Sequence, residues 1–181
     1  MKLNTLFVSF LLVACQLSFG QDTSGLKKRQ PKKLSESSVA VTRAEAVRTF
    51  ERVGELLQSV LHVTSPKHFS LKSDAVAVTR SEVLEQFGVL YHAAEPAFRV
   101  TMHDANFDPK RIKIDRPEQK KLVDLLLVRG CVEPYCSLVT GRSKPLSVAE
   151  FGDFVGFFVA RITEMSHTSS TKWTPYLRAG Q

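Results

Sequence analysis

The sequence predicts a mainly α-helical domain, a bundle of helix-loop-helix units with short extended pieces. The motif VAVTR occurs twice, at residues 39–43 and 76–80, and each copy opens an apolar pattern with helical spacing. A third segment, LSVAEFGDFVGFFVARI, begins with a similar polar signal and is strongly apolar. Hydrophobic residues make up 43% of the 181 residues, which is ordinary for a globular protein with a compact core.

All three segments are expected to begin with a capping box, in which a threonine or serine lies three residues before a glutamate. The hydroxyl accepts a hydrogen bond from the amide of the third helical residue, and the glutamate reaches back to the cap. The pairs are Thr42 with Glu45, Thr79 with Glu82, and Ser147 with Glu150. This shared start indicates equivalent structural units.

The first two helices are expected over residues 43–62 and 80–94. Each has one apolar side that should face the core. These inner faces are Ala46, Val47, Phe50, Val53, Leu57, Val60 and Leu61 in the first helix, and Val83, Leu84, Phe87, Leu90 and Tyr91 in the second. Pro66 and Pro96 are expected to end the two helices, because the residue before a proline disfavours helical geometry.

Two further helices are expected over residues 118–128 and 147–164, and Gly130 gives the earlier one a natural stop. The later one carries apolar residues on nearly all sides, so we expect it to be the central helix of the core. The domain therefore spans residues 39–164. Within it, residues 98–117 are polar and irregular, with one short candidate strand at residues 111–114.

The N-terminal 20 residues have the layout of a secretory signal peptide, with Lys2, an apolar run and then small residues. Two processing outcomes stay open. One is cleavage before Gln21; the other is lipidation of Cys15, because the preceding Leu-Val-Ala resembles a bacterial lipobox. Both predict an exported protein of the bacterial cell envelope or periplasm, lipid-anchored in the second case.

Residues 21–38 are polar and rich in lysine and arginine, which predicts a disordered basic linker. The linker is either a solvated tether or a contact to an anionic polymer or membrane surface. Nucleic acid is not an expected partner, because no aromatic residues interleave the basic ones and the protein is exported. The C-terminal tail, residues 165–181, is polar, and its tryptophan, Trp173, either docks on the domain or is mobile.

Cys131 and Cys136 are the two cysteines of the predicted domain, five positions apart around a Glu-Pro turn. In an oxidising compartment they are expected to form a local disulfide. The alternatives are two buried free thiols, or a metal or redox site. The five histidines are scattered and form no zinc motif, so no metal and no other cofactor is expected.

On these motifs the chain resembles the S-layer homology (SLH) family, a repeat module of bacterial cell-envelope proteins. Units of that family end in a loop, a short extended piece with a Thr-Arg-Ala-Glu signature, and a helix. Residues 42–45 reproduce the signature, residues 79–82 nearly do so, and residues 147–150 keep the cap and the glutamate. The resemblance thus covers most of the predicted domain in outline.

The resemblance implies three units around a pseudo-threefold axis, with glycan-binding grooves between them. The signature arginine of the family contacts anionic cell-wall saccharide, which makes Arg43 and Arg80 the candidate glycan-binding residues. At the equivalent position the third unit has Val148. The spacing is also uneven, with 37 positions between the first two units and 68 between the second and third.

The sequence therefore predicts a non-catalytic module that binds cell-wall polysaccharide or peptidoglycan. The alternatives are a small secreted hydrolase and a helical partner-binding protein of an envelope complex. The hydrolase is less favoured, because the sequence has no Gly-x-Ser-x-Gly, zinc or glycine-rich phosphate motif. Three carboxylates that could serve a hydrolase, Asp104, Asp108 and Asp115, fall in the irregular segment. No catalytic residue is predicted.

Overall fold

The computed structural model describes residues 39–66, 69–100 and 119–168. The elements of this part are α2 (Arg43–Leu61), α3 (Arg80–Ala94), the 3-10 helix η1 (Glu95–Ala97), α4 (Lys120–Val128), α5 (Ser137–Thr140) and α6 (Val148–Met165). The predicted mainly helical class is confirmed. The signal region with Cys15, the basic linker, Trp173, the candidate strand at 111–114 and the three aspartates of the irregular segment lie outside the described residues.

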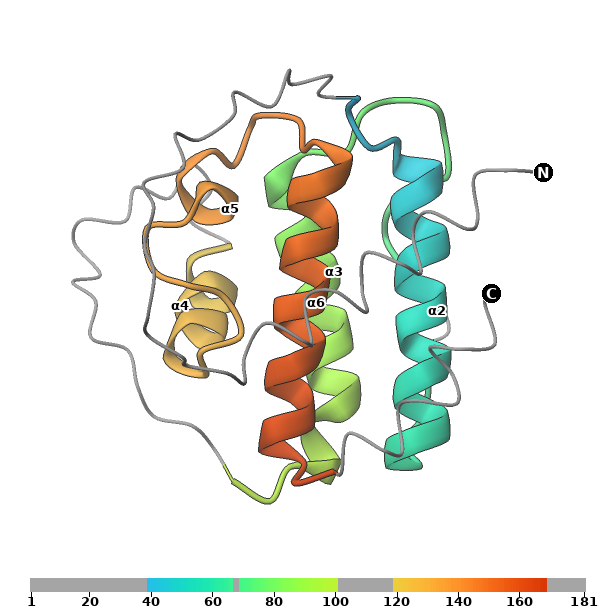
Figure 1. The fold of residues 1–181 in the computed structure, drawn as a ribbon, viewed down its shortest axis with the longest axis vertical. Coiled ribbons are helices and arrows are strands. Elements are labelled where there is room, and N and C mark those ends of the chain that lie inside the picture. Colours follow the sequence, from blue (N-terminus) through green and yellow to red (C-terminus); the bar gives the residue numbers. More distant parts are fainter. Residues whose placement is uncertain (1–38, 67–68, 101–118, 169–181) are drawn as a thin grey trace, which may run out of the picture.

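Helices α2, α3 and α6 run parallel and begin at the same end of the molecule, with α4 and α5 on one side of them (Figure 1). Helix α3 packs against all four of the other α-helices, and ten of its 15 residues are buried. We expected α6 to be the central helix, but α3 takes that place. The reason is that the apolar residues of α6 are not all covered: Phe154 and Phe157 are only half-buried.

The helix starts agree with the sequence prediction, and all three capping boxes are present. Helix α3 also ends at the predicted residue, whereas α2 ends before Pro66 is reached. His62 takes the left-handed conformation with φ of 56°, and its amide donates to the carbonyl of Gln58. The stop of α2 is therefore a left-handed cap.

Between α4 and α6 the chain makes a compact connection that contains α5, an element that was not predicted. Gly130 has φ of 66°, which confirms it as the stop after α4. Cys136 then precedes α5, and the Gly141 amide donates to the Ser137 carbonyl at its end. A four-residue helix has little sequence periodicity to reveal it.

Phenylalanine rings from α2, α3 and α6 meet in the centre of the core. The Phe50 ring contacts Phe87 and Phe151 edge to face, with centroid distances of 6.1 and 5.6 Å. Phe87 stacks on Phe158 at 4.4 Å. The predicted inner faces of α2 and α3 are buried, apart from Leu61, which is half-buried.

Candidate functional site

The extended pieces that precede α2, α3 and α6 are joined in a closed cycle of backbone hydrogen bonds. The amide of Val41 donates to the Leu146 carbonyl, at 2.9 Å. The Leu146 amide donates to Val78, at 3.2 Å, and the Val78 amide donates back to Val41, at 2.8 Å. Each piece therefore bonds both of the others, so the three units are related by a pseudo-threefold axis.

A second cycle of backbone hydrogen bonds lies two residues further along the chain, at the first residue of each helix. The three amide-to-carbonyl bonds are Arg43 to Val76 at 2.8 Å, Arg80 to Lys144 at 3.2 Å, and Val148 to Val39 at 3.1 Å. The cycle establishes Arg43, Arg80 and Val148 as equivalent positions. The units can pair in the same way despite their unequal spacing in sequence, because the additional residues between the second and third units take no part in either cycle.

The capping glutamates use one carboxylate oxygen for their own helix. In each unit Oε2 accepts from the amide and hydroxyl of the cap residue, at distances between 2.8 and 3.2 Å. The pKa of Glu45 is lowered, chiefly by the hydrogen bond that its carboxylate accepts from the Thr42 backbone amide. For Glu82 and Glu150, partial burial alone would raise the pKa. The hydrogen bonds from the cap residue and from the arginine together outweigh burial, so the pKa of both carboxyl groups is lowered.

In Glu82 and Glu150 the other carboxylate oxygen, Oε1, forms an ion pair with an arginine of the neighbouring unit. Arg43 Nη2 lies 2.7 Å from Oε1 of Glu82. Arg43 Nη1 also lies 3.3 Å from Oδ2 of Asp74, in the loop before α3. The bond to Glu82 is the main cause that raises the pKa of Arg43. Its side chain remains 25% exposed, so this guanidinium is reachable from solvent.

Arg80 makes the same bridge at the next junction but is buried. Its Nη2 lies 2.7 Å from Oε1 of Glu150, and only 8% of its side chain is exposed. Its Nη1 donates to the carbonyls of Lys144, at 3.2 Å, and Pro145. Arg80 therefore directs its donors into the domain, whereas Arg43 keeps a solvent-facing side.

The third junction has the glutamate but no arginine. Glu45 holds Thr42 through Oε2, as its two counterparts hold their caps. The residue that would supply the bridge is Val148, and no described residue forms an ion pair with Glu45. Two of the three junctions are thus bridged by arginine side chains. The third is held by the backbone hydrogen bonds of the two cycles.

Val148→Arg is expected to complete the third bridge and to raise the free energy of unfolding by about 0.2 to 1 kcal/mol. The new guanidinium would meet Glu45 as Arg43 meets Glu82, while its stem replaces part of the valine contact. Urea unfolding measures the effect. Ala149→Arg is the matched control, because it adds the same charge at the neighbouring exposed residue. Equal stability of the two variants would contradict the bridge.

A buried polar cluster behind Arg80 was not predicted from sequence. Gln119 Oε1 accepts from Ser81 Oγ at 2.6 Å and from Arg142 Nη2 at 2.8 Å, and Gln119 Nε2 donates to Glu85. Ser81 follows Arg80 directly, so the cluster joins the start of α3 to the start of α4. The lack of any motif for such a polar contact explains why sequence reasoning missed it.

Cys131 and Cys136 are free cysteines in the structure, and the disulfide expected in an oxidising compartment stays a prediction. Cys131, in the connection between α4 and α5, is fully buried, and burial raises its pKa to about 12. Cys136 is half-buried and caps the start of α5.

Within residues 39–66, 69–100 and 119–168, no cluster of three histidine, cysteine or acidic side chains is arranged to hold a metal ion. None of the helices in those ranges combines the length and apolar character that a membrane span requires.

Compared with known proteins, the chain matches no family model, no curated protein and no solved structure. The arrangement of its own residues is therefore the basis for a functional inference.

Proposed function

We propose that the protein is a non-catalytic, SLH-like module of the bacterial cell envelope, which binds an anionic cell-wall glycan or a peptidoglycan-associated polymer. The observation that carries this proposal is the threefold junction: three capped helices begin around one axis, and arginines of the Thr-Arg-x-Glu motifs bridge neighbouring units. The family that the sequence resembles binds glycan in the grooves between such units.

Arg43 is the contact that we propose for the ligand. Its guanidinium is partly exposed and is shared between Glu82 and Asp74. The Asp74 contact is the longer of the two, and 38% of the Asp74 side chain is exposed. A carboxylate or pyruvyl group on the glycan can therefore displace Asp74 from Nη1 while Glu82 keeps the guanidinium in place.

Lys72 is exposed in the same loop as Asp74, and its carbonyl accepts the Asp74 amide at 3.1 Å. Lys72 therefore adds a positive charge to the loop that is hydrogen-bonded to the start of α2. Arg80 is proposed as the bridge that maintains the junction, because its donors are turned inward.

Arg43→Ala is expected to weaken co-sedimentation of the full chain with isolated cell-wall sacculi by about tenfold, because a charge-assisted contact is lost. Arg48→Ala is the matched control: Arg48 is exposed on the same helix, and its loss changes the charge equally. A titration in salt separates this binding from nonspecific adsorption by the basic linker, which salt should remove first.

Glu82→Gln distinguishes ligand contact from maintenance of the junction. The single amide oxygen of glutamine can still complete the capping box, but its NH2 group is a donor and cannot replace the carboxylate oxygen that accepts from Arg43, so the bridge is lost. If Arg43 contacts the glycan, Glu82→Gln should lose less binding than Arg43→Ala, because the guanidinium is still present; if Arg43 acts only through the junction, both variants should lose binding equally. Equal binding by the Arg43 and Arg48 variants would reject the proposed contact, and failure of the wild-type chain to sediment would reject the proposed function.

A further inference from the structure

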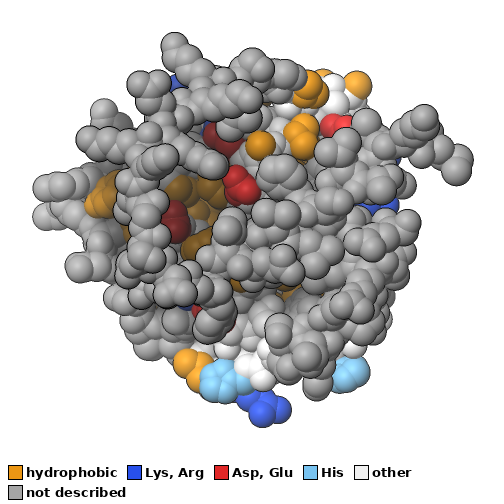
Figure 2. All heavy atoms as spheres, viewed as in Figure 1, with side chains coloured by type: hydrophobic (Ala, Val, Ile, Leu, Met, Phe, Trp, Pro, Cys, Tyr) orange, Lys and Arg blue, Asp and Glu red, His pale blue; other side chains and the backbone are white. Residues whose placement is uncertain are grey.

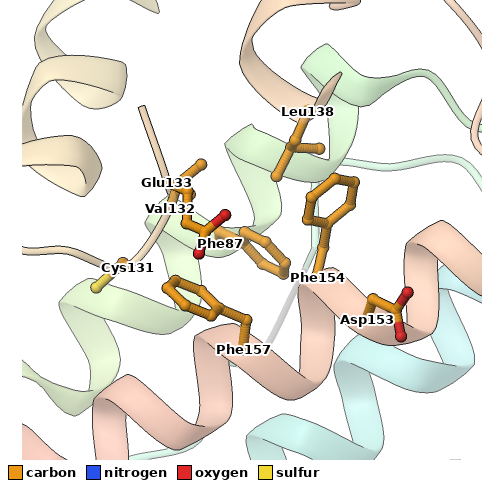
Figure 3. A pocket seen from close by; sticks show the side chains of 8 residues that line it. All are labelled: Phe87, Cys131, Val132, Glu133, Leu138, Asp153, Phe154 and Phe157. Atoms are coloured by element: carbon orange, nitrogen blue, oxygen red, sulfur yellow. The ribbon is translucent and has the colours of Figure 1, made fainter. Parts of the chain in front are cut away.

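An apolar pocket of about 160 Å³ lies between α3, α6 and the α4–α5 connection, away from the threefold junction. Its wall contains the rings of Phe87, Phe154 and Phe157 together with Leu138 and Val132 (Figure 3). In Figure 2, hydrophobic side chains and a few acidic ones are visible on the side of α4 and α5. An apolar cavity of about 150 Å³ accommodates a benzene-sized ring, so this pocket has the size for one aromatic side chain.

Two exposed carboxylates, Glu133 and Asp153, complete the lining. Neither forms an ion pair with a described residue. The protein as a whole has a net charge of +7, so these two carboxylates give the pocket a negative rim on a positively charged protein. The combination suits an aromatic group with a positive charge next to it.

The wall of the pocket is held in place before anything binds. Arg161 lies over the Phe157 ring, 5.6 Å from its centroid, and its Nε donates to the Gly130 carbonyl at 3.0 Å. Phe87 is fixed from behind by its stack on Phe158. A ligand would therefore meet ordered rings, which reduces the entropy cost of binding.

We propose that the pocket binds the indole ring of Trp173 from the C-terminal segment of the same chain. Residues 169–181 contain Lys172 and Arg178 and no acidic residue, so their charge is complementary to Glu133 and Asp153. Lys172 immediately precedes Trp173. An indole in the pocket therefore places a positive charge beside the acidic rim.

The end of α6 has a left-handed cap that stops the helix before the C-terminal segment. His167 has φ of 50°; its amide donates to the Glu164 carbonyl at 3.1 Å, and the Thr168 amide donates to Thr163 at 3.2 Å. These two bonds form a Schellman motif, which ends the helix and turns the chain away from its axis.

The distances allow the return. Trp173 follows Thr168 by five residues, which span up to about 17 Å when extended. Phe157 lies eight residues before the end of α6, or about 12 Å along the helix axis. Attachment to the same chain also gives the ring a high effective concentration at the pocket.

Trp173 is the only tryptophan of the chain, so its fluorescence reports the contact directly. In the native full chain its emission is expected to be shifted to the blue, and acrylamide should quench it about threefold less efficiently than in the free peptide of residues 169–181, because a docked ring is shielded from solvent. Both values should be independent of protein concentration. Water-exposed emission with peptide-like quenching in the native chain would overturn the proposal.

Charge reversal at the rim tests where the ring binds. The double variant Glu133→Lys with Asp153→Lys should bring quenching close to that of the free peptide, because the rim then repels Lys172. The matched control is Glu51→Lys with Glu55→Lys, two exposed residues of α2, which should leave quenching unchanged. Far-UV circular dichroism verifies that both variants fold.

Phe154→Ala enlarges the pocket from the half-buried side and should also increase quenching. If Trp173 is protected but none of the pocket variants changes its quenching, the ring docks elsewhere and the proposal is wrong. Protection that disappears on dilution would assign the ring to the pocket of a second copy, which overturns binding within one chain.

Discussion

Arg80→Ala is expected to lower the free energy of unfolding by about 3 kcal/mol. Arg80 bridges to Glu150 and donates to two loop carbonyls while almost entirely buried. Removal of the guanidinium leaves the carbonyls of Lys144 and Pro145 with fewer donors and takes the partner from Glu150. Chemical denaturation followed by circular dichroism measures this loss.

Arg43→Ala provides the comparison, because the same residue type makes the same bridge in a more exposed place. Solvent screens that pair, so its loss should cost clearly less stability than the loss of Arg80. Arg80→Lys should fall between the wild type and Arg80→Ala, since an ammonium can reach Glu150 but lacks the fork that also serves the carbonyls. Equal destabilisation by Arg43→Ala and Arg80→Ala would show that the difference in burial does not change how much each bridge contributes to stability.

The starts of the three long helices could be predicted from sequence because the capping box is local. Thr42 and Glu45 contact each other across three residues, and the geometry of one helical turn fixes their spacing. The apolar faces of α2 and α3 were predictable for a similar reason, since helical periodicity places their members on one side. The left-handed cap at His62 has no such signal, so the stop of α2 was attributed to Pro66, although the expected end at residue 62 differs from the observed Leu61 by only one residue.

The different roles of Arg43 and Arg80 could not be read from their motifs, which differ by one residue. Burial of Arg80 comes from the 141–145 loop, whose Gly141 lies close enough that an added Cβ would be 3.1 Å from the Arg80 Cδ. That loop is distant in sequence, so its approach depends on the tertiary fold. The Asp74 contact to Arg43 is unpredictable for the same reason.

The absence of an arginine at the third unit was visible in the sequence as Val148, but its consequence was not. Only the backbone cycles establish that Val148 faces Glu45 in the way that Arg43 faces Glu82.

Phe50→Ala is expected to destabilise the domain by about 3 to 5 kcal/mol, because the truncation leaves a cavity where α2, α3 and α6 meet. The Phe50 ring is fully buried and contacts Phe69, Phe87 and Phe151, so no single neighbour can move in without giving up its own contacts. Phe154→Ala, at a half-buried ring, should cost about 1 kcal/mol. Urea unfolding of the two variants measures the difference, and a loss at Phe50 no larger than that at Phe154 would mean that the three helices do not share one rigid core.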